Sequence, residues 1–100
     1  MAIAMFAKIP GGTAEMYDAL NEAMGITPDN VPDGLISHYA GPLAEDKWIV
    51  FDVWESQEDF ERFAETQLKP AMKQIAGADA PPMEPRFIPL YNELHAPVRV

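Results

Sequence analysis

The sequence predicts a single α+β domain over residues 1–100, with the split β-α-β-β-α-β order of a ferredoxin-like fold. Three observations support this fold class. A chain of 100 residues has the size of one domain with one hydrophobic core. Its apolar segments are either short strand-like runs or stripes at helical spacing. Turn and capping residues separate them, and no internal repeat or low-complexity segment interrupts the order.

The first strand and the first helix are predicted before residue 26. Ala2–Ile9 is apolar apart from Lys8 and ends at the turn cluster 10–12, which is typical of a strand. Thr13 stands at an N-cap position and Gly25 at a left-handed C-cap position of a helix. Between them the apolar residues recur at helical spacing: Met16, Tyr17, Leu20, Ala23 and Met24. Turn residues then predict a loop over 27–34.

A hairpin of two strands is predicted next. Leu35–Ala40 is a short apolar run, and Lys47–Glu55 is rich in β-branched and aromatic residues. Gly41-Pro42 and Glu45-Asp46 separate the two runs, so we expect the turn there.

A second helix and a last strand complete the predicted order. Ser56 with Asp59 three residues later resembles a capping box, and Pro70 should kink the helix or end its regular part. The buried stripe of this helix is predicted at Phe60, Phe63, Ala64, Leu68, Met72 and Ile75. A Pro-rich connector over Gly77–Pro85 leads to a strand over Arg86–His95, in which Pro89 indicates an edge or a bulge.

The third strand predicts a homodimer, because both of its faces are apolar. One face carries Ile49, Phe51 and Val53, and the other carries Trp48, Val50, Asp52 and Trp54. Burying apolar surface is worth about 25 cal/mol for each Å². We therefore expect a second copy to cover the face with the tryptophans, so that two sheets close one barrel. The alternative is that long loops or the C-terminal residues 96–100 cover it.

Composition limits the partners and the compartment. The chain has 16 acidic and 7 basic residues, a net charge of -9, which disfavours nucleic acids and anionic membranes as partners. The absence of cysteine excludes disulfides, thiolate nucleophiles and cysteine zinc sites. The apolar N-terminal run is too short to cross a bilayer and lacks a basic start, so we expect a cytoplasmic protein.

His38 and Asp52 are the candidate catalytic residues. His38 shares a strand face with Ile36 and Ala40, and histidine changes its charge near neutral pH, as a general base must. The alternative is a core histidine that is hydrogen-bonded across the sheet. Asp52 is the lone charge of an apolar strand, so it needs a partner or a proton. That partner is Arg86 or His38, and the role of Asp52 is then structural or catalytic.

Four aromatic residues are candidates for substrate binding. Trp48 and Trp54 share a face with Asp52 and offer flat walls to a planar ligand, or they fill the barrel of the dimer. Tyr39 and Tyr91 offer hydroxyl groups that orient a substrate, or they are ordinary surface tyrosines, and His95 is expected to be exposed. The adaptable lining of the core or pocket is predicted at Met5, Met16, Met24, Met72 and Met83.

No cofactor or metal is expected from the motifs. The sequence contains no Gly-rich phosphate loop, no paired-histidine metal spacing and no serine triad on a sharp turn. These absences disfavour nucleotide cofactors and hydrolytic metals.

Four segments carry a resemblance to a known family: GLISHYAG at 34–41, WIVFDVWES at 48–56, EDFERF at 58–63 and LKPA at 68–71. With these segments the chain resembles the antibiotic biosynthesis monooxygenase-like group of dimeric α+β barrel proteins, and the element order extends the match to the whole chain. The resemblance implies a ferredoxin-like protomer, a dimer with face-to-face sheets, and a pocket between sheet and helices. The group includes cofactor-free quinone-forming monooxygenases, haem degraders, polyketide cyclases and proteins without known activity.

The resemblance leaves three functional hypotheses. One is a cofactor-independent oxygenase of a phenolic or polyketide-like aromatic, with His38 or Asp52 as base. Another is a cyclase or isomerase that uses the same base without oxygen. The third is a non-catalytic module that holds a hydrophobic metabolite or a partner, which backbone or arginine partners of His38 and Asp52 would favour. Haem is disfavoured, because the second helix lacks the axial histidine of the haem degraders and only His38 or His95 could replace it.

Overall fold

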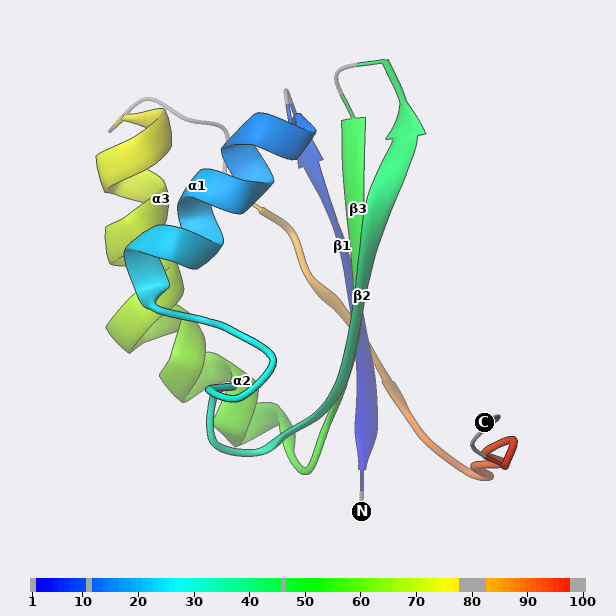
Figure 1. Ribbon diagram of the computed structural model, residues 1–100. Helices are drawn as coiled ribbons and strands as arrows, with labels where there is room; N and C mark the ends of the chain where they lie inside the picture. The colour runs from blue at the N-terminus through cyan, green and yellow to red at the C-terminus, as the bar shows by residue number, and fades with distance from the viewer. Residues whose placement is uncertain (1, 11, 46, 78–82, 98–100) are drawn as a thin grey trace.

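The structure, a computed structural model, describes residues 2–10, 12–45, 47–77 and 83–97. Its elements follow the order β1 Ile3–Pro10, α1 Ala14–Met24, β2 Leu35–Ala44, β3 Lys47–Trp54, α2 Gln57–Phe63, the π-helical turn η1 Ala64–Leu68, α3 Lys69–Ala76 and β4 Arg86–Pro89. The strands form one antiparallel sheet in the order β2-β3-β1-β4, and the helices cover one of its faces (Figure 1). The predicted α+β class and β-α-β-β-α-β order are therefore confirmed.

The helix caps agree with the sequence. Thr13 is the N-cap of α1, and its Oγ1 accepts a hydrogen bond of 3.1 Å from the Met16 amide. Gly25 ends the helix with a left-handed φ of 69°. Ser56 caps α2 in the same way, with its Oγ 3.2 Å from the Asp59 amide nitrogen.

Pro70 interrupts the second helical region as predicted. The backbone widens to a π-turn over Ala64–Leu68, in which the Lys69 amide donates to the Ala64 carbonyl. Pro70 lies immediately after this turn at the start of α3, where its missing N–H is tolerated. The proline thus divides one predicted helix into α2, η1 and α3.

Two strand boundaries differ from the prediction. β2 continues through Gly41 and Pro42 to Ala44, with irregular register at both ends, because an edge strand tolerates a proline. β4 ends at Pro89 rather than at His95, since Pro89 has no N–H and the residues after Leu90 leave the sheet. They extend beyond the face opposite the helices (Figure 1). Most of the predicted connector Gly77–Pro85 lies outside the described residues, as do residues 98–100 of the C-terminal tail.

The helices cover the face of β3 that carries Trp48, Val50, Asp52 and Trp54, so the prediction that a second copy covers this face is wrong. Trp54 is 1% exposed and Val50 is 8% exposed within one chain. They form one buried cluster with Met5, Ala7, Ile9 and Phe60. A strand alternates its side chains, so the helices can pack on only one of its two apolar faces.

The opposite face of the sheet, here called the open face, is the one that lacks helices. Strand pairing places Phe6, Tyr39 and Phe51 side by side on it, because Phe51 is the register partner of both. Tyr39 is 64% exposed and Phe51 is 42% exposed. An apolar surface therefore remains uncovered on one chain, but it is the face of Phe51 and not that of the tryptophans.

Candidate functional site

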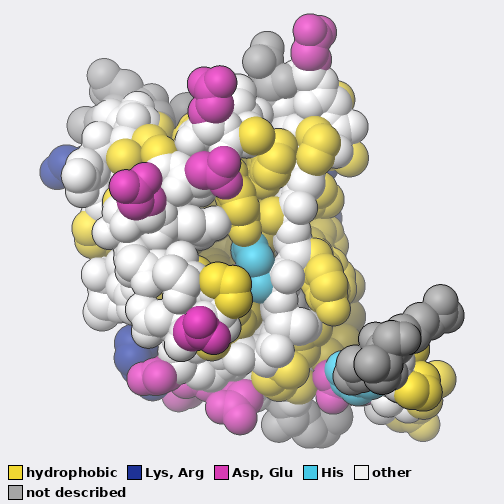
Figure 2. All heavy atoms as spheres, viewed as in Figure 1, with side chains coloured by type: hydrophobic (Ala, Val, Ile, Leu, Met, Phe, Trp, Pro, Cys, Tyr) yellow, Lys and Arg dark blue, Asp and Glu magenta, His cyan; other side chains and the backbone are white. Residues whose placement is uncertain are grey.

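A cavity of about 460 Å³ lies between the helices and the covered face of the sheet. Figure 2 shows the corresponding hollow, with the side chain of His38 visible inside a mostly hydrophobic surround. The apolar lining includes Met5, Leu20, Met24, Phe60, Phe63 and Met83. Three of the five methionines predicted as adaptable lining are therefore in the cavity, and the cavity lies where the resemblance implies a pocket. Its size suits a small organic molecule.

His38 reaches the cavity from the edge strand β2, where it is the register partner of Asp52 on β3. Its Nδ1 lies 2.5 Å from Oδ1 of Asp52, a short hydrogen bond between the two strands. The side chain of His38 is 34% exposed and that of Asp52 is 6% exposed. The imidazole therefore contacts a buried carboxylate on one side and lines the cavity on the other.

Asp52 has a second donor. The indole Nε1 of Trp54, two residues later on the same face of β3, donates a bond of 3.1 Å to Oδ2 of Asp52. The two carboxylate oxygens thus have one partner each, which offsets the cost of burying the group. The predicted alternative, that Arg86 is the partner, is wrong. Arg86 is paired with Phe6, one residue along β1 from the Met5 that faces Asp52, so it belongs to the opposite face.

Tyr17 of α1 completes the site, and its role there was not predicted. Its hydroxyl forms a short hydrogen bond with Nε2 of His38. The two rings are parallel within 2°, with centroids 5.9 Å apart, and Trp48 packs on Tyr17 at 5.5 Å. In the sequence, Tyr17 belongs to the apolar stripe of the first helix. A hydroxyl in such a stripe needs a polar partner, and that is the signal that could have identified it.

Tyr17, His38, Asp52 and Trp54 therefore form one continuous hydrogen-bonded chain, here called the polar chain. If Asp52 is ionised, Nδ1–H of His38 donates to it, and Nε2 of the neutral imidazole then accepts a hydrogen bond from the hydroxyl of Tyr17. Trp54 donates to the same carboxylate from the other side. Such an arrangement can hold an imidazole in one tautomer and stabilise its charge after it takes up a proton.

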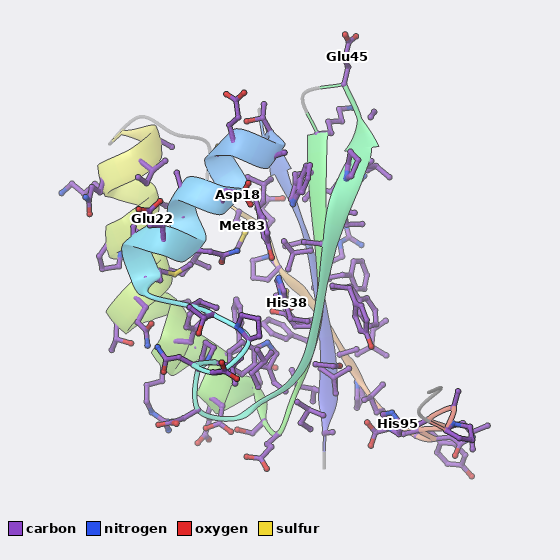
Figure 3. The ribbon with its side chains drawn as sticks, in the orientation of Figure 1. Asp18, Glu22, His38, Glu45, Met83 and His95 are labelled. Carbon is purple, nitrogen blue, oxygen red and sulfur yellow. The ribbon has the colours of Figure 1, made fainter. Side chains whose placement is uncertain are left out.

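The other predicted substrate-binding residues lie elsewhere. Trp54 lines the cavity, whereas Trp48 lies behind Tyr17 and outside the lining, its buried Nε1 without a hydrogen-bond partner in the described part of the chain. Tyr39 is on the open face, and Tyr91 is fully exposed in the C-terminal segment, so neither is placed to contact a ligand in this cavity. His95 is exposed in that segment as well (Figure 3).

The described residues include neither a metal-binding cluster nor a membrane-spanning helix. Within residues 2–10, 12–45, 47–77 and 83–97, no group of three or more histidine or carboxylate side chains could hold a metal ion. None of the helices described is long and apolar enough to cross a membrane.

The fold has clear relatives among solved structures. NE2512 of Nitrosomonas europaea, a protein of unknown function, is similar with a TM-score of 0.69, 20% identity and 95% coverage of each chain. A variant of SnoaB of Streptomyces nogalater, a cofactor-independent oxygenase, has a TM-score of 0.60 at 13% identity, over 93% of this chain and 96% of that one. A candidate antibiotic biosynthesis monooxygenase of Deinococcus radiodurans has a TM-score of 0.62 at 10% identity, over 96% and 98%.

No family model and no curated protein matches the sequence. The identities to the solved structures are too low to transfer an activity, but they extend over nearly the whole chain. The chain therefore has the fold of the antibiotic biosynthesis monooxygenase-like dimeric α+β barrel proteins, as its sequence resemblance predicts.

Proposed function

We propose that the protein binds a small aromatic or hydrophobic molecule in the cavity and oxidises it with dioxygen, without a cofactor, by using His38 as a base. The observation that carries this proposal is the polar chain, because it brings a histidine and a buried carboxylate together in a mostly apolar cavity. A catalytic base is oriented by a further group that lies within hydrogen-bond reach of it. The 2.5 Å contact between His38 and Asp52 meets that requirement.

The residues of the site have distinct roles in this proposal. His38 takes up the proton that the substrate loses, and Asp52 stabilises the imidazolium that results. The substrate anion then reacts with dioxygen. For a ring CH₂ group that becomes a carbonyl, one oxygen atom becomes the carbonyl oxygen and the other leaves as water with the two hydrogens, so no further reductant is needed.

The walls of the cavity favour a flat ligand. Trp54 packs against Phe60 at 5.6 Å and against Phe63 at 5.5 Å, and all three line the cavity. Aromatic walls stabilise planar rings by stacking and by excluding water. A polycyclic phenol of polyketide type fits this chemistry.

Oxygen uptake tests the proposal. With dihydroxyanthrone as substrate, the wild type should consume dioxygen, and His38→Ala should lower the rate by about a hundredfold or more. His95→Ala is the matched control, because His95 is exposed in the C-terminal segment and should behave as wild type. Equal rates in all three proteins would exclude His38 as the base. Proton abstraction without oxygen uptake would indicate a cyclase or isomerase.

A non-catalytic binding module is the second candidate. Both ring nitrogens of His38 have partners in the free protein, Tyr17 on one side and Asp52 on the other. These partners are side chains rather than the backbone or arginine groups that we expected of a module, but they leave no nitrogen free. Ligand binding without turnover, unaffected by His38→Ala, would support this alternative.

The proposal includes a homodimer in which a second copy covers the open face. Tyr39, Phe51 and Ile88 are all exposed on this face by 42% or more. The C-terminal segment extends on the same side of the sheet (Figure 1) and carries Tyr91 and Leu94, which are 100% and 88% exposed. Apolar surfaces of this kind on small domains are usually covered by a partner.

A further inference from the structure

We infer that Tyr17 is a catalytic residue of the proposed reaction, and that its phenol oxygen, rather than the imidazole of His38, exchanges the proton with the substrate. The inference rests on the proposed function and goes beyond it. It assigns a role to a residue on α1 that the strand residues alone do not suggest, and it limits the class of substrate.

The inference rests on the hydrogen bonds of His38, which use both of its ring nitrogens. An imidazole has two nitrogens, and here Nδ1 is bound by Asp52 while Nε2 is bound by Tyr17. Neither nitrogen can contact a substrate in this arrangement. Because Tyr17 lines the cavity too, its hydroxyl is the outermost group of the polar chain.

Packing holds Tyr17 in this position. Its ring lies between Trp48, at 5.5 Å, and His38, at 5.9 Å. The rings of Tyr17 and His38 are parallel within 2°, and the hydroxyl of Tyr17 forms a short hydrogen bond with Nε2. Displacing the hydroxyl to free Nε2 would break this hydrogen bond.

The proton transfer balances without an additional reactant. The substrate hydroxyl gives its proton to Oη of Tyr17 while Tyr17 gives its own proton to Nε2 of His38. The imidazolium that forms donates from Nδ1 to Asp52, whose second oxygen continues to accept from Trp54. The substrate is left as an anion, no electron moves in this step, and the reverse transfer restores the chain.

The charges around the cavity define the substrate class. None of the described lining residues is a lysine or arginine, and the one lining carboxylate, Asp52, is already bound. Exposed Asp18 and Glu22 project from α1, the helix that carries Tyr17 (Figure 3). A carboxylate or phosphate ligand would therefore have no counterion and would be repelled. The substrate is a molecule that enters neutral and carries one acidic hydroxyl, such as a phenol or an enol.

Para-nitrophenol tests proton transfer without turnover, because its anion is yellow and its neutral form is colourless. At a pH where free para-nitrophenol is mostly neutral, binding to the wild type should raise the yellow fraction. Tyr17→Phe should bind the probe but leave it colourless, since Phe keeps the ring packing and removes the acceptor. Tyr91→Phe makes the same change at a fully exposed position outside the cavity and should behave as wild type.

The possible outcomes separate this inference from the proposed function. A yellow complex in both wild type and Tyr17→Phe would show that proton transfer does not need the Tyr17 hydroxyl, which overturns the inference and leaves the proposed function intact. A failure of para-nitrophenol to bind the wild type would overturn the proposed phenol site and this inference with it. A melting temperature for each variant shows that it is folded.

Kinetics with dihydroxyanthrone give a second readout that a structural tyrosine would not change. Tyr17→Phe should lower kcat by about a hundredfold, the usual share of a proton-transfer group, with little change in KM. In mixtures of H₂O and D₂O, the wild-type rate plotted against the fraction of D₂O should give a curve, because two protons move in the same step. This measurement needs no variant. A straight line together with a normal kcat in Tyr17→Phe would overturn the inference.

Discussion

His38 and Asp52 lie opposite each other on neighbouring strands, and their side chains meet at 2.5 Å from Nδ1 to Oδ1. One residue belongs to the edge strand β2 and the other to the central strand β3, so the sheet itself fixes their separation. The contact faces the helices, in the same layer as the hydrophobic cluster. Changes at this contact should therefore affect both the stability and the proposed chemistry.

Asp52→Asn should reduce both properties. The amide keeps the shape of the carboxylate but has only one oxygen to accept from His38 and Trp54, so one buried donor loses its partner. We expect a loss of about 1 to 3 kcal/mol in the free energy of unfolding, measured with urea. Oxygen uptake should fall because the imidazolium loses its counterion. Asp29→Asn, at an exposed loop position, is the control. Unchanged stability and uptake in Asp52→Asn would contradict this account of the pair.

The two tryptophans of β3 provide a matched comparison. They lie on the same face, but Nε1 of Trp54 donates to Asp52, whereas Nε1 of Trp48 is buried without a partner in the described residues. Trp54→Phe should therefore cost more stability than Trp48→Phe, by about 1.5 to 3 kcal/mol, the usual worth of a hydrogen bond to a charged group. Thermal and urea unfolding of both variants measure the difference. Equal losses would mean that the hydrogen bond from Trp54 to Asp52 makes no net contribution to the free energy of unfolding.

Gly34 is expected to tolerate no side chain. Its φ is 87°, and a Cβ at this position would lie 2.5 Å from Cγ of Asp59. The Asp59 carboxylate in turn accepts hydrogen bonds from the hydroxyl of Ser56 and the guanidinium of Arg62, so it cannot move without breaking these bonds. Gly34→Ala should destabilise the protein by more than the roughly 1 to 2 kcal/mol of a left-handed backbone alone.

Two other glycines separate the backbone contribution to that loss of stability from the contribution of the contact with Asp59. A Cβ at Gly25 meets nothing within 4 Å but has a φ of 69°, and one at Gly41 meets nothing in an ordinary backbone. Measured by urea unfolding, the losses should rise from Gly41→Ala to Gly25→Ala to Gly34→Ala. A Gly34→Ala variant no less stable than Gly25→Ala would show that Asp59 is free to move.

The two faces of β3 should respond differently to a new charge. Val50→Asp places a carboxylate in the core, where Val50 is 8% exposed, and should unfold the chain. Phe51→Asp places it on the open face, where Phe51 is 42% exposed, and should leave a folded monomer. Sedimentation and circular dichroism distinguish the two results. A wild type that sediments only as an 11.1 kDa species at micromolar concentration would contradict the proposed dimer.

Much of the fold was accessible from sequence because local signals agreed with one another. Thr13, Gly25 and Ser56 marked helix ends through their own chemistry, and Pro70 marked the irregular turn. The end of β4 was predicted too late, because nothing local in 90–95 shows that pairing with β1 stops.

The site could be predicted only in part from the sequence. When both faces of a strand are apolar, the sequence does not show which face the helices cover. That choice depends on the packing of α1, α2 and α3, and it placed the tryptophans inside rather than at a dimer interface. Tyr17 was missed for a related reason. Its partner His38 is 21 residues away, and only the packing of α1 on the sheet brings them together.

The location of ligand binding tests the central claim most directly. Titration of isotope-labelled protein with para-nitrophenol, followed by NMR, reports which residues sense the ligand. We expect the largest shifts at cavity residues of the covered face, namely Tyr17, His38 and Trp54, with the open-face residues Tyr39 and Phe51 unaffected. Shifts centred on Tyr39 and Phe51, with Tyr17 and His38 unchanged, would contradict it.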